Sequence, residues 1–271
     1  MKRIVDSFLT TFLLVTRIPI KREIRLEYGL TVFFLPLMGV VVVVVLTAAA
    51  FGAHYGIGDP FIVAVLILAV QYGLFNIFHF DGLLDSADAL IVFAGREKRL
   101  EILKDVKIGS FAFFVGVMYI VTKLYLVSRG IAIVFELESG ATVRLAGAVI
   151  LFSYAISGRA AAAFVPCVLS PARSGGLGAL LIDSRLRHAI LGTVVAIAAG
   201  AAAWGVVPGA AQSYGWWPIV AFLAVPAAGL LSGIPFKRKI GGYTGDTLGL
   251  SVEIGEVIHL LIFYSVMRGA A

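Results

Sequence analysis

Cysteine is nearly absent from this sequence, and charged residues are scarce. The single cysteine, Cys167, excludes a disulfide within the chain. Only 14% of the 271 residues are Asp, Glu, Lys or Arg, whereas soluble domains average about 25%. Hydrophobic residues make up 60% of the chain, and its mean hydropathy is +1.00. This composition excludes a soluble globular domain and predicts an integral membrane protein.

Several apolar stretches of about 20 residues recur along the chain, long enough to cross a hydrocarbon core of roughly 30 Å. None of them alternates in the manner of an outer-membrane strand, so helices are predicted. We therefore predict an all-α, polytopic bundle forming one domain over residues 1–271, with segment 4–20 in or near the membrane interface. The seven predicted spans cover residues 30–53, 60–78, 110–128, 145–168, 188–207, 217–234 and 250–267.

Lysine and arginine are distributed unevenly between the loops. The loops at 21–29, 90–108, 169–187 and 235–246 contain three, five, three and three of them, whereas those at 53–59, 130–143 and 208–217 contain none. Seven crossings put the two sets on opposite sides, and the positive-inside rule makes the basic set cytoplasmic. We therefore attribute the net charge of +6 to orientation in an inner cell membrane, beside lipid headgroups, and expect no nucleic-acid partner.

Three aspartates gather at the end of the second apolar stretch. The spacing of Asp81, Asp85 and Asp88 places all three carboxylates on one face of a helix. Aligned carboxylates repel one another unless a cation neutralises them, and hard oxygen ligands suit Mg²⁺ shared with substrate phosphate oxygens. We favour a metal-binding catalytic centre. The alternative is a helix end with solvated acids, or a helix N-terminus whose dipole favours negative charge.

Other polar residues flank these aspartates. His79 is a candidate for substrate binding or for orienting a carboxylate, and equally for a plain hydrogen-bonding residue at the interface. Asp105 is a candidate metal ligand, while the adjacent Lys104 and Lys107 are candidates for phosphate binding. The same segment also fits an amphipathic interfacial helix whose basic side meets lipid headgroups.

Arg159 lies within the predicted span 145–168. A charge in an apolar span costs at least a few kcal/mol, so such a residue normally faces the bundle interior and has a partner. We expect Arg159 to grip a phosphate with its planar guanidinium. An ion pair with Glu253 or Asp81 is the structural alternative.

A glycine-rich loop, GGYTGDTLG, joins a basic cluster to the last predicted span. Glycines allow close approach of the backbone, and amide groups at a helix N-terminus can cradle an anion. Asp246 in this loop is a candidate metal ligand or helix N-cap. The candidate substrate-binding residues of the loop are Gly241, Gly242, Thr244 and Gly245.

These motifs, taken in order, resemble the cobalamin synthase family, also called adenosylcobinamide-GDP ribazoletransferases. The similarity covers nearly the whole chain, from FLLVTRIPI and FFLPLMGVV near the start. It continues through HFDGLLDSADAL, ILKDVKIGSF, ISGRAAAAF, GGLGALL and GGYTGDTLGLSVEIGE. The family commonly has HLDG, KDSRIG and TGDTLGA where this chain has Phe80, Val106 with Lys107, and Leu250.

The resemblance implies a Mg²⁺-dependent membrane transferase acting on adenosylcobinamide-GDP and α-ribazole or its 5′-phosphate. A ribazole hydroxyl would attack the phosphate that bears adenosylcobinamide, and GMP would leave. The Asp81, Asp85 and Asp88 set would bind the metal and supply the base, while Asp105 and Asp246 would complete the site. The cations Lys104, Lys107 and Arg159 would hold the diphosphate, and residues 241–245 would approach the nucleotide. The sequence does not reveal the oligomeric state and leaves a homo-oligomer open.

Two other kinds of protein share some of these features. Membrane transferases of the CDP-alcohol phosphotransferase or prenyltransferase type also use Asp-rich helices with Mg²⁺. The D-x-x-D-G-x-x-A-R order of the first is absent here, and the second would require another D-x-x-x-D motif. A transporter would also have intramembrane charges, but it predicts an internal repeat, and the sequence contains no convincing one.

Overall fold

The structure is a computed structural model and describes residues 2–136, 140–206 and 217–270. Helices account for most of the described residues, which contain no β-strand, only one isolated bridge between Pro171 and Tyr243. The all-α prediction is therefore confirmed. The helices are α1 (Lys2–Val15), α2 (Thr31–Ile57), α3 (Pro60–Gln71), η1 (Tyr72–Asn76), α4 (Ile77–Ile91), α5 (Arg96–Ile102), α6 (Ser110–Glu136), α7 (Ala141–Phe152), α8 (Tyr154–Val168), η2 (Leu177–Leu181), α9 (Leu186–Val206), α11 (Trp217–Ile240) and α12 (Gly245–Ala270).

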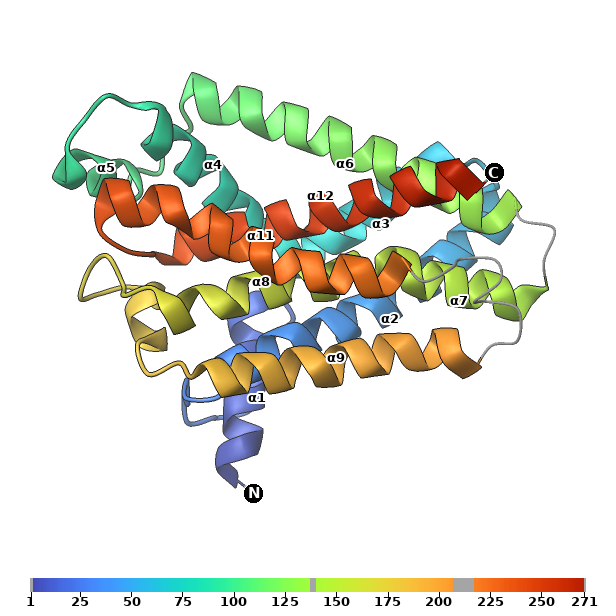
Figure 1. Ribbon diagram of the computed structural model, residues 1–271, viewed down its shortest axis with the longest axis horizontal. Coiled ribbons are helices and arrows are strands. Elements are labelled where there is room, and N and C mark those ends of the chain that lie inside the picture. Colours follow the sequence, from blue (N-terminus) through green and yellow to red (C-terminus); the bar gives the residue numbers. More distant parts are fainter. Residues whose placement is uncertain (1, 137–139, 207–216, 271) are drawn as a thin grey trace.

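Most of the long helices run side by side along one direction, and α1 crosses them at the lower left of Figure 1. Helix α12 is central and packs against α4, α8 and α11. Small residues permit this packing: a Cβ atom on Gly158 of α8 would lie only 2.4 Å from the carbonyl oxygen of Val252. Close backbone approach at small residues is typical of helix packing in membranes.

Five helical segments are long and apolar enough to cross a membrane: 31–57, 60–91, 110–136, 141–168 and 245–268. They correspond to five of the seven predicted spans. Helices α9 and α11 occupy the ranges of the other two, and within α9 the apolar part is Leu186–Ala202. Seven crossings therefore stay a prediction. Helix α1 has 14 residues and is about 21 Å long, shorter than a hydrocarbon core of roughly 30 Å. Its location at the membrane interface stays a prediction.

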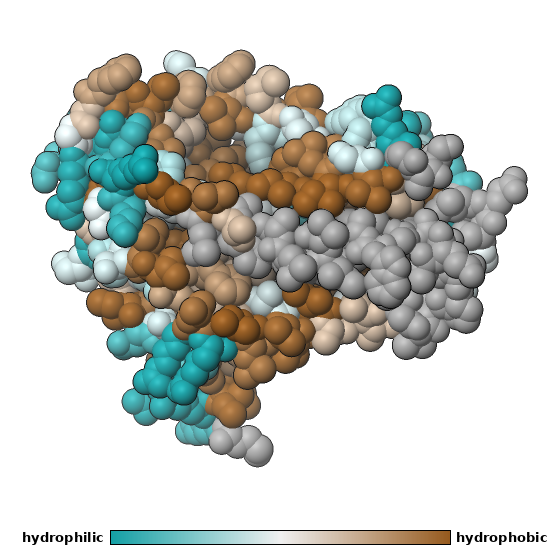
Figure 2. All heavy atoms as spheres, viewed as in Figure 1, coloured by the Kyte–Doolittle hydropathy of each residue, from teal (hydrophilic) through white to brown (hydrophobic). Residues whose placement is uncertain are grey.

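The loops rich in lysine and arginine lie at one end of the bundle. The segment around α5, the connection between α8 and α9 and the junction of α11 with α12 all lie at the left of Figure 1. Figure 2 shows hydrophilic side chains gathered over that end and hydrophobic side chains across the middle of the visible face. The predicted grouping of these three loops is thus correct, and the middle of the bundle presents an apolar surface suited to lipid.

The interior contains a charged network between helices. Nζ of Lys123 on α6 lies 3.3 Å from Oε2 of Glu253 and 2.5 Å from Oε2 of Glu256, both on α12. Nη1 of Arg159 on α8 lies 3.2 Å from Oε1 of Glu256. All four side chains are fully buried, and the two positive charges balance the two negative ones. Neutral hydrogen-bond donors to the two glutamates come from Gln71, Tyr72, Asn76 and Tyr119.

A π-helical turn contributes to this network. Residues Tyr72–Asn76 form η1, a widened turn between α3 and α4, and such turns are frequent at functional sites. Tyr72 and Asn76, at its two ends, both donate hydrogen bonds to Glu253. The turn therefore helps to fix α4 relative to α12, the two helices that form the site described next.

Candidate active site

The candidate site lies where α4 crosses the beginning of α12. A Cβ atom on Gly82 would lie 2.6 Å from the carbonyl oxygen of Asp246, and one on Gly249 would lie 2.9 Å from that of His79. These two glycines therefore let the helix backbones touch. The contact brings Asp246 to the part of α4 that holds Asp81 and Asp85, and the carboxylates of Asp81 and Asp246 are both close enough to repel that of Asp85.

Asp81 and Asp85 are one helical turn apart on α4. Asp81 is exposed and Asp85 is partly buried. Within the described part of the chain, neither carboxylate has a hydrogen-bond or ion-pair partner. Two adjacent carboxylates without partners repel each other, so this pair is suited to a cation or to a proton acceptor role.

Asp88 has a different environment. Its Oδ2 accepts a hydrogen bond from the backbone N–H of Gly109 at 2.7 Å, and its Oδ1 accepts one from Ala112 at 2.9 Å. These amides belong to the start of α6, whose first N–H groups have no partner within the helix. Asp88 thus caps α6 from α4. Because both of its carboxylate oxygens accept these hydrogen bonds, the contacts of Asp88 favour a structural role over metal binding.

Asp246 is held at the N-terminus of α12 by local hydrogen bonds. Thr244 Oγ1 donates to Asp246 Oδ2 at 3.0 Å. The backbone N–H of Thr244 donates to Thr247 Oγ1 at 2.9 Å, and that of Thr247 donates to Thr244 Oγ1 at 3.4 Å. This reciprocal capping explains why the helix begins at Gly245. Thr244 is buried, so its contact orients Asp246.

Arg173 completes this cluster, although the sequence pattern did not single it out. Its Nη2 lies 3.8 Å from Asp246 Oδ2. Its Nη1 is buried and has no hydrogen-bond partner among the described residues. The backbone of Gly176, at φ +87°, lies beside the guanidinium, since a Cβ there would be 3.6 Å from Nε. A guanidinium held in place with an unused buried donor is suited to bind an anion.

The glycine-rich loop packs against the loop that bears Arg173. The backbone N–H of Tyr243 donates to the carbonyl of Ser170, and that of Ala172 donates to the carbonyl of Tyr243. A Cβ on Gly242 would lie 2.1 Å from the Ser170 carbonyl oxygen, so only glycine fits at this position between the two loops. Gly241 is exposed at φ +81°, and Gly245 is half-buried. Only these last two glycines have surface available for the expected approach to a nucleotide.

The segment after α5 lies at the same end of the bundle, as Figure 1 shows. Lys104, Asp105 and Lys107 are all exposed. Asp105 Oδ1 accepts a hydrogen bond from the backbone N–H of Lys107 at 3.1 Å, and its carboxylate is near enough to act electrostatically on Asp85. The two lysines are therefore accessible to an anionic ligand, and phosphate binding by them stays a prediction.

Arg159 is separated from this cluster by its place in the charged network. Its guanidinium donates to Glu256 Oε1 at 3.2 Å, to Asn76 Oδ1 at 2.9 Å and to the Ala155 carbonyl at 3.2 Å. The side chain is fully buried. The phosphate-gripping role expected for Arg159 is thus not supported by its contacts. The structural alternative fits, with Glu256 as the partner in place of Glu253 or Asp81.

An apolar pocket of about 380 Å³ opens beside the aspartates. His79, Asp81 and Asp246 are among its lining residues. His79 is buried, and its ring Nδ1 has no hydrogen-bond partner among the described residues. This position keeps His79 a candidate substrate-binding residue.

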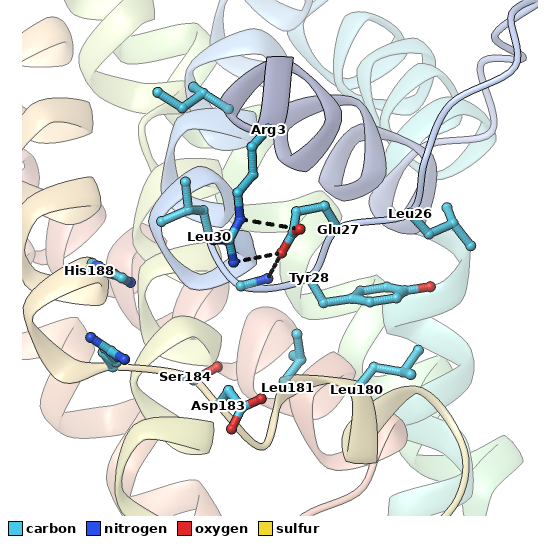
Figure 3. Close-up of a pocket in the computed structure, with 13 residues that line it drawn as sticks. Arg3, Leu26, Glu27, Tyr28, Leu30, Leu180, Leu181, Asp183, Ser184 and His188 are labelled. Carbon is cyan, nitrogen blue, oxygen red and sulfur yellow. Dashed lines mark hydrogen bonds and ion pairs between the residues drawn. The ribbon is translucent and has the colours of Figure 1, made fainter. Parts of the chain in front are cut away.

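A larger polar pocket of about 790 Å³ adjoins the apolar one, since Leu181 lines both. Figure 3 shows it between α1 with residues 26–30 on one side and residues 180–188 on the other. Arg3 reaches from α1 to Glu27, with Nε 3.2 Å from Oε2 and Nη2 3.3 Å from Oε1. The pocket has both acidic and basic residues, including Asp183 and Arg185. Its lining therefore offers hydrogen-bond donors and acceptors from charged side chains of both signs.

We expect the pKa of Glu27 to lie below its ordinary value of 4.5, because its carboxylate accepts hydrogen bonds from Arg3 and from the backbone N–H of Gly29. The Arg3–Glu27 contact should be fully formed above pH 4.5 and lost only as the pH falls through the lowered value. NMR titration of ¹³C-labelled glutamate carboxyls would measure this. In Arg3→Gln the pKa should rise toward 4.5, and an unchanged pKa would contradict the contact.

The number of acidic side chains that meet at the site decides how Mg²⁺ could be bound there. Among the described residues, no three His, Cys, Asp or Glu side chains form a group that could hold a metal ion. Mg²⁺ in phosphoryl-transfer sites is commonly bound by one or two carboxylates together with substrate phosphates, so a complete protein cage is not required. The unpartnered pair Asp81 and Asp85 fits binding of this kind, in which two carboxylates share the ion with substrate phosphates.

Comparison with known sequences identifies the family. The sequence model described as cobalamin-5-phosphate synthase matches residues 7–264, nearly the whole chain. The chain belongs to the cobalamin-5-phosphate synthase family. The resemblance seen in the motifs is thereby confirmed, and with it the prediction of an enzyme.

Similar proteins named adenosylcobinamide-GDP ribazoletransferase come from several bacteria. The one from Fervidobacterium nodosum is 27% identical over 95% of this chain and 96% of its own length. The protein from Escherichia coli O17:K52:H18 is 29% identical over 91% of this chain and 94% of its own length. The protein from Rhizobium etli is 30% identical over 74% of this chain and 73% of its own length. No solved structure matches the chain.

Proposed function

We propose that this chain is a Mg²⁺-dependent transferase of the cell inner membrane that completes the lower nucleotide loop of cobalamin. Its substrates would be adenosylcobinamide-GDP and α-ribazole or its 5′-phosphate, and its products adenosylcobalamin or its 5′-phosphate and GMP. Its site would face the cytoplasm, because the lysine- and arginine-rich loops surround the α4–α12 crossing. The membership of the family and the names of its relatives support this activity.

The reaction is a phosphoryl transfer between two held substrates. The ribazole 3′-oxygen forms a new bond to the phosphorus atom that bears adenosylcobinamide, and the bond from that phosphorus to the GMP oxygen breaks. The proton of the attacking hydroxyl passes to a carboxylate, for which Asp81 is the exposed candidate. GMP leaves with the electron pair of the broken bond. Positioning and neutralisation of charge provide most of the catalysis in such reactions.

Different residues around the α4–α12 crossing would perform different parts of this reaction. Asp81 and Asp85 would hold Mg²⁺ together with substrate phosphate oxygens, and the bound ion would neutralise charge on those oxygens. Asp246 would lie opposite this pair. Arg173 would bind the diphosphate through its unused Nη1. Lys104 and Lys107 would add positive charge from the exposed segment after α5.

The observation that supports this proposal most is the convergence of unpartnered carboxylates and a partly unpaired guanidinium at one crossing, in a member of this family. It is tested with purified protein in detergent, both substrates, and Mg²⁺ at increasing concentration. Formation of GMP and a cobalamin product should require Mg²⁺ and stop on addition of a chelator. Equal rates with and without chelator would contradict the metal assignment, whereas transfer of phosphatidyl or prenyl groups instead would contradict the substrate assignment.

Arg173→Ala should raise the KM for adenosylcobinamide-GDP at least about tenfold, because a charged hydrogen bond to the diphosphate is lost. Arg173→Lys should restore only part of the affinity for adenosylcobinamide-GDP, since lysine keeps the charge but cannot form the bidentate hydrogen bonds of a guanidinium. Arg187→Ala, an exposed arginine at the start of α9, is the matched control and should leave the KM unchanged. If Arg173→Ala lowers thermal stability and leaves the KM unaltered, Arg173 serves only to hold Asp246.

A further inference from the structure

We propose that the apolar pocket beside the aspartates binds the base of the nucleoside acceptor, so that its ribose lies at Asp81 and Asp246. The inference rests on the proposed function and assigns a location to one of its two substrates. It starts from the composition of the pocket walls. The apolar lining includes residues of α1, α2, η2 and α12: Leu13, Val15, Leu35, Leu177, Leu181 and Val252.

Two polar side chains in this apolar lining have unused hydrogen-bonding atoms. Thr31 is 3% exposed and His79 is 8% exposed. Thr31 Oγ1 and His79 Nδ1 both lack a partner among the described residues, although both residues line the pocket. Unsatisfied polar atoms in an apolar site are costly. A few polar groups within apolar walls are typical of sites that bind small organic ligands and fix their orientation.

The size and chemistry of the pocket select among the parts of the two substrates. A corrinoid bears many polar amides and is too bulky for about 380 Å³ of mostly apolar space. The guanine base would require several hydrogen bonds along its polar edge, and its phosphates belong next to Arg173. The dimethylated benzimidazole of α-ribazole is flat, apolar and has one free ring nitrogen. Thr31 Oγ1 or His79 Nδ1 can donate a hydrogen bond to that nitrogen.

The position of the pocket agrees with the reaction. Asp81 and Asp246 line the same pocket, so a nucleoside whose base lies against Leu35 and Val252 can place its ribose next to these carboxylates. The attacking hydroxyl would then be within reach of Asp81. Leu13 and Leu177 are 36% and 57% exposed, which leaves them at the mouth, where an apolar base could enter from the membrane interface.

Two substitutions test this inference, each with a control on the same helix. Thr31→Val removes the unused hydroxyl at nearly constant volume, and Thr47→Val does the same to another buried, unpartnered threonine of α2 outside the pocket. Leu13→Trp narrows the mouth, and Val5→Trp enlarges an exposed residue of α1 that lines neither pocket. The dissociation constant of α-ribazole is measured by equilibrium dialysis in detergent, and the KM of each substrate by GMP release.

Thr31→Val should weaken α-ribazole binding about threefold to tenfold, the loss of one neutral hydrogen bond. Leu13→Trp should weaken it at least tenfold. Both should leave the KM for adenosylcobinamide-GDP unchanged, and the two controls should behave as wild type. If wild type forms product but both variants bind α-ribazole normally, the base binds elsewhere, and the pocket holds a lipid chain or nothing; the inference is then wrong and the proposed function stands. If wild type neither binds α-ribazole nor forms product, the pocket assignment and the proposed function are both wrong.

Discussion

Asp81→Asn should reduce turnover by about 10²–10⁴-fold while the protein remains folded. The substitution keeps the size of the side chain and removes the charge that would accept the proton of the attacking hydroxyl or bind the metal. Asp81 is exposed and has no partner among the described contacts, so its stabilising interactions are few. Removal of a charge that repels Asp85 should leave the melting temperature unchanged or slightly higher.

The matched control is Glu97→Gln on α5, which removes the same charge at the same end of the bundle from an exposed side chain. Its turnover should equal that of wild type. Steady-state rates of GMP release and thermal unfolding in detergent would be measured for both variants. Full activity of Asp81→Asn would remove Asp81 from the site and leave Asp85 and Asp246 as the remaining carboxylates at the crossing.

Glu256→Gln should lower the free energy of unfolding by about 3–5 kcal/mol, the typical cost of removing one partner from a buried ion pair. Glu256 contacts both Lys123 and Arg159, so its neutralisation leaves two buried cations facing Glu253 alone. The expected result is a melting temperature in detergent that is lower by several degrees. Activity should fall with it if the network fixes α12, and thus Asp246, relative to α4.

Glu136→Gln, an exposed acid at the end of α6, is the control for charge and should have the melting temperature of wild type.

Arg159→Ala separates the two roles considered for that arginine, a phosphate contact and a partner in the buried ion-pair network. Loss of stability in the variant, with an unchanged KM for adenosylcobinamide-GDP in the fraction that folds, agrees with the network. A large rise in KM in a protein of normal stability would return Arg159 to the substrate site.

Much of the fold could be predicted because the membrane restricts the possibilities. Long apolar runs can only be helices there, and the loop charges alone grouped residues 90–108, 169–187 and 235–246 at one end, where the structure places them. The stripe formed by Asp81 and Asp85 followed from helical periodicity. Their approach to Asp246 followed only from the family resemblance, since it depends on the contact at Gly82 and Gly249.

The remaining assignments required three-dimensional information. The partner of Arg159 is decided by the axial register of α8 against α12, which no spacing within either helix reveals. Asp88 shares the stripe with Asp81, but it meets the start of α6, 21 residues further on. Arg173 lies in an irregular loop with no periodicity. Its signal was limited to a basic residue in a glycine-rich segment, and only the structure shows its Nη1 without a partner.

The most direct test of the central claim is whether GMP release depends on the nucleoside acceptor. Purified protein in liposomes with Mg²⁺ and adenosylcobinamide-GDP should release almost no GMP alone. Addition of α-ribazole should start release and yield one cobalamin product for each GMP. An equal rate of GMP release with and without α-ribazole would indicate hydrolysis by water. No release under either condition would contradict the proposed transfer.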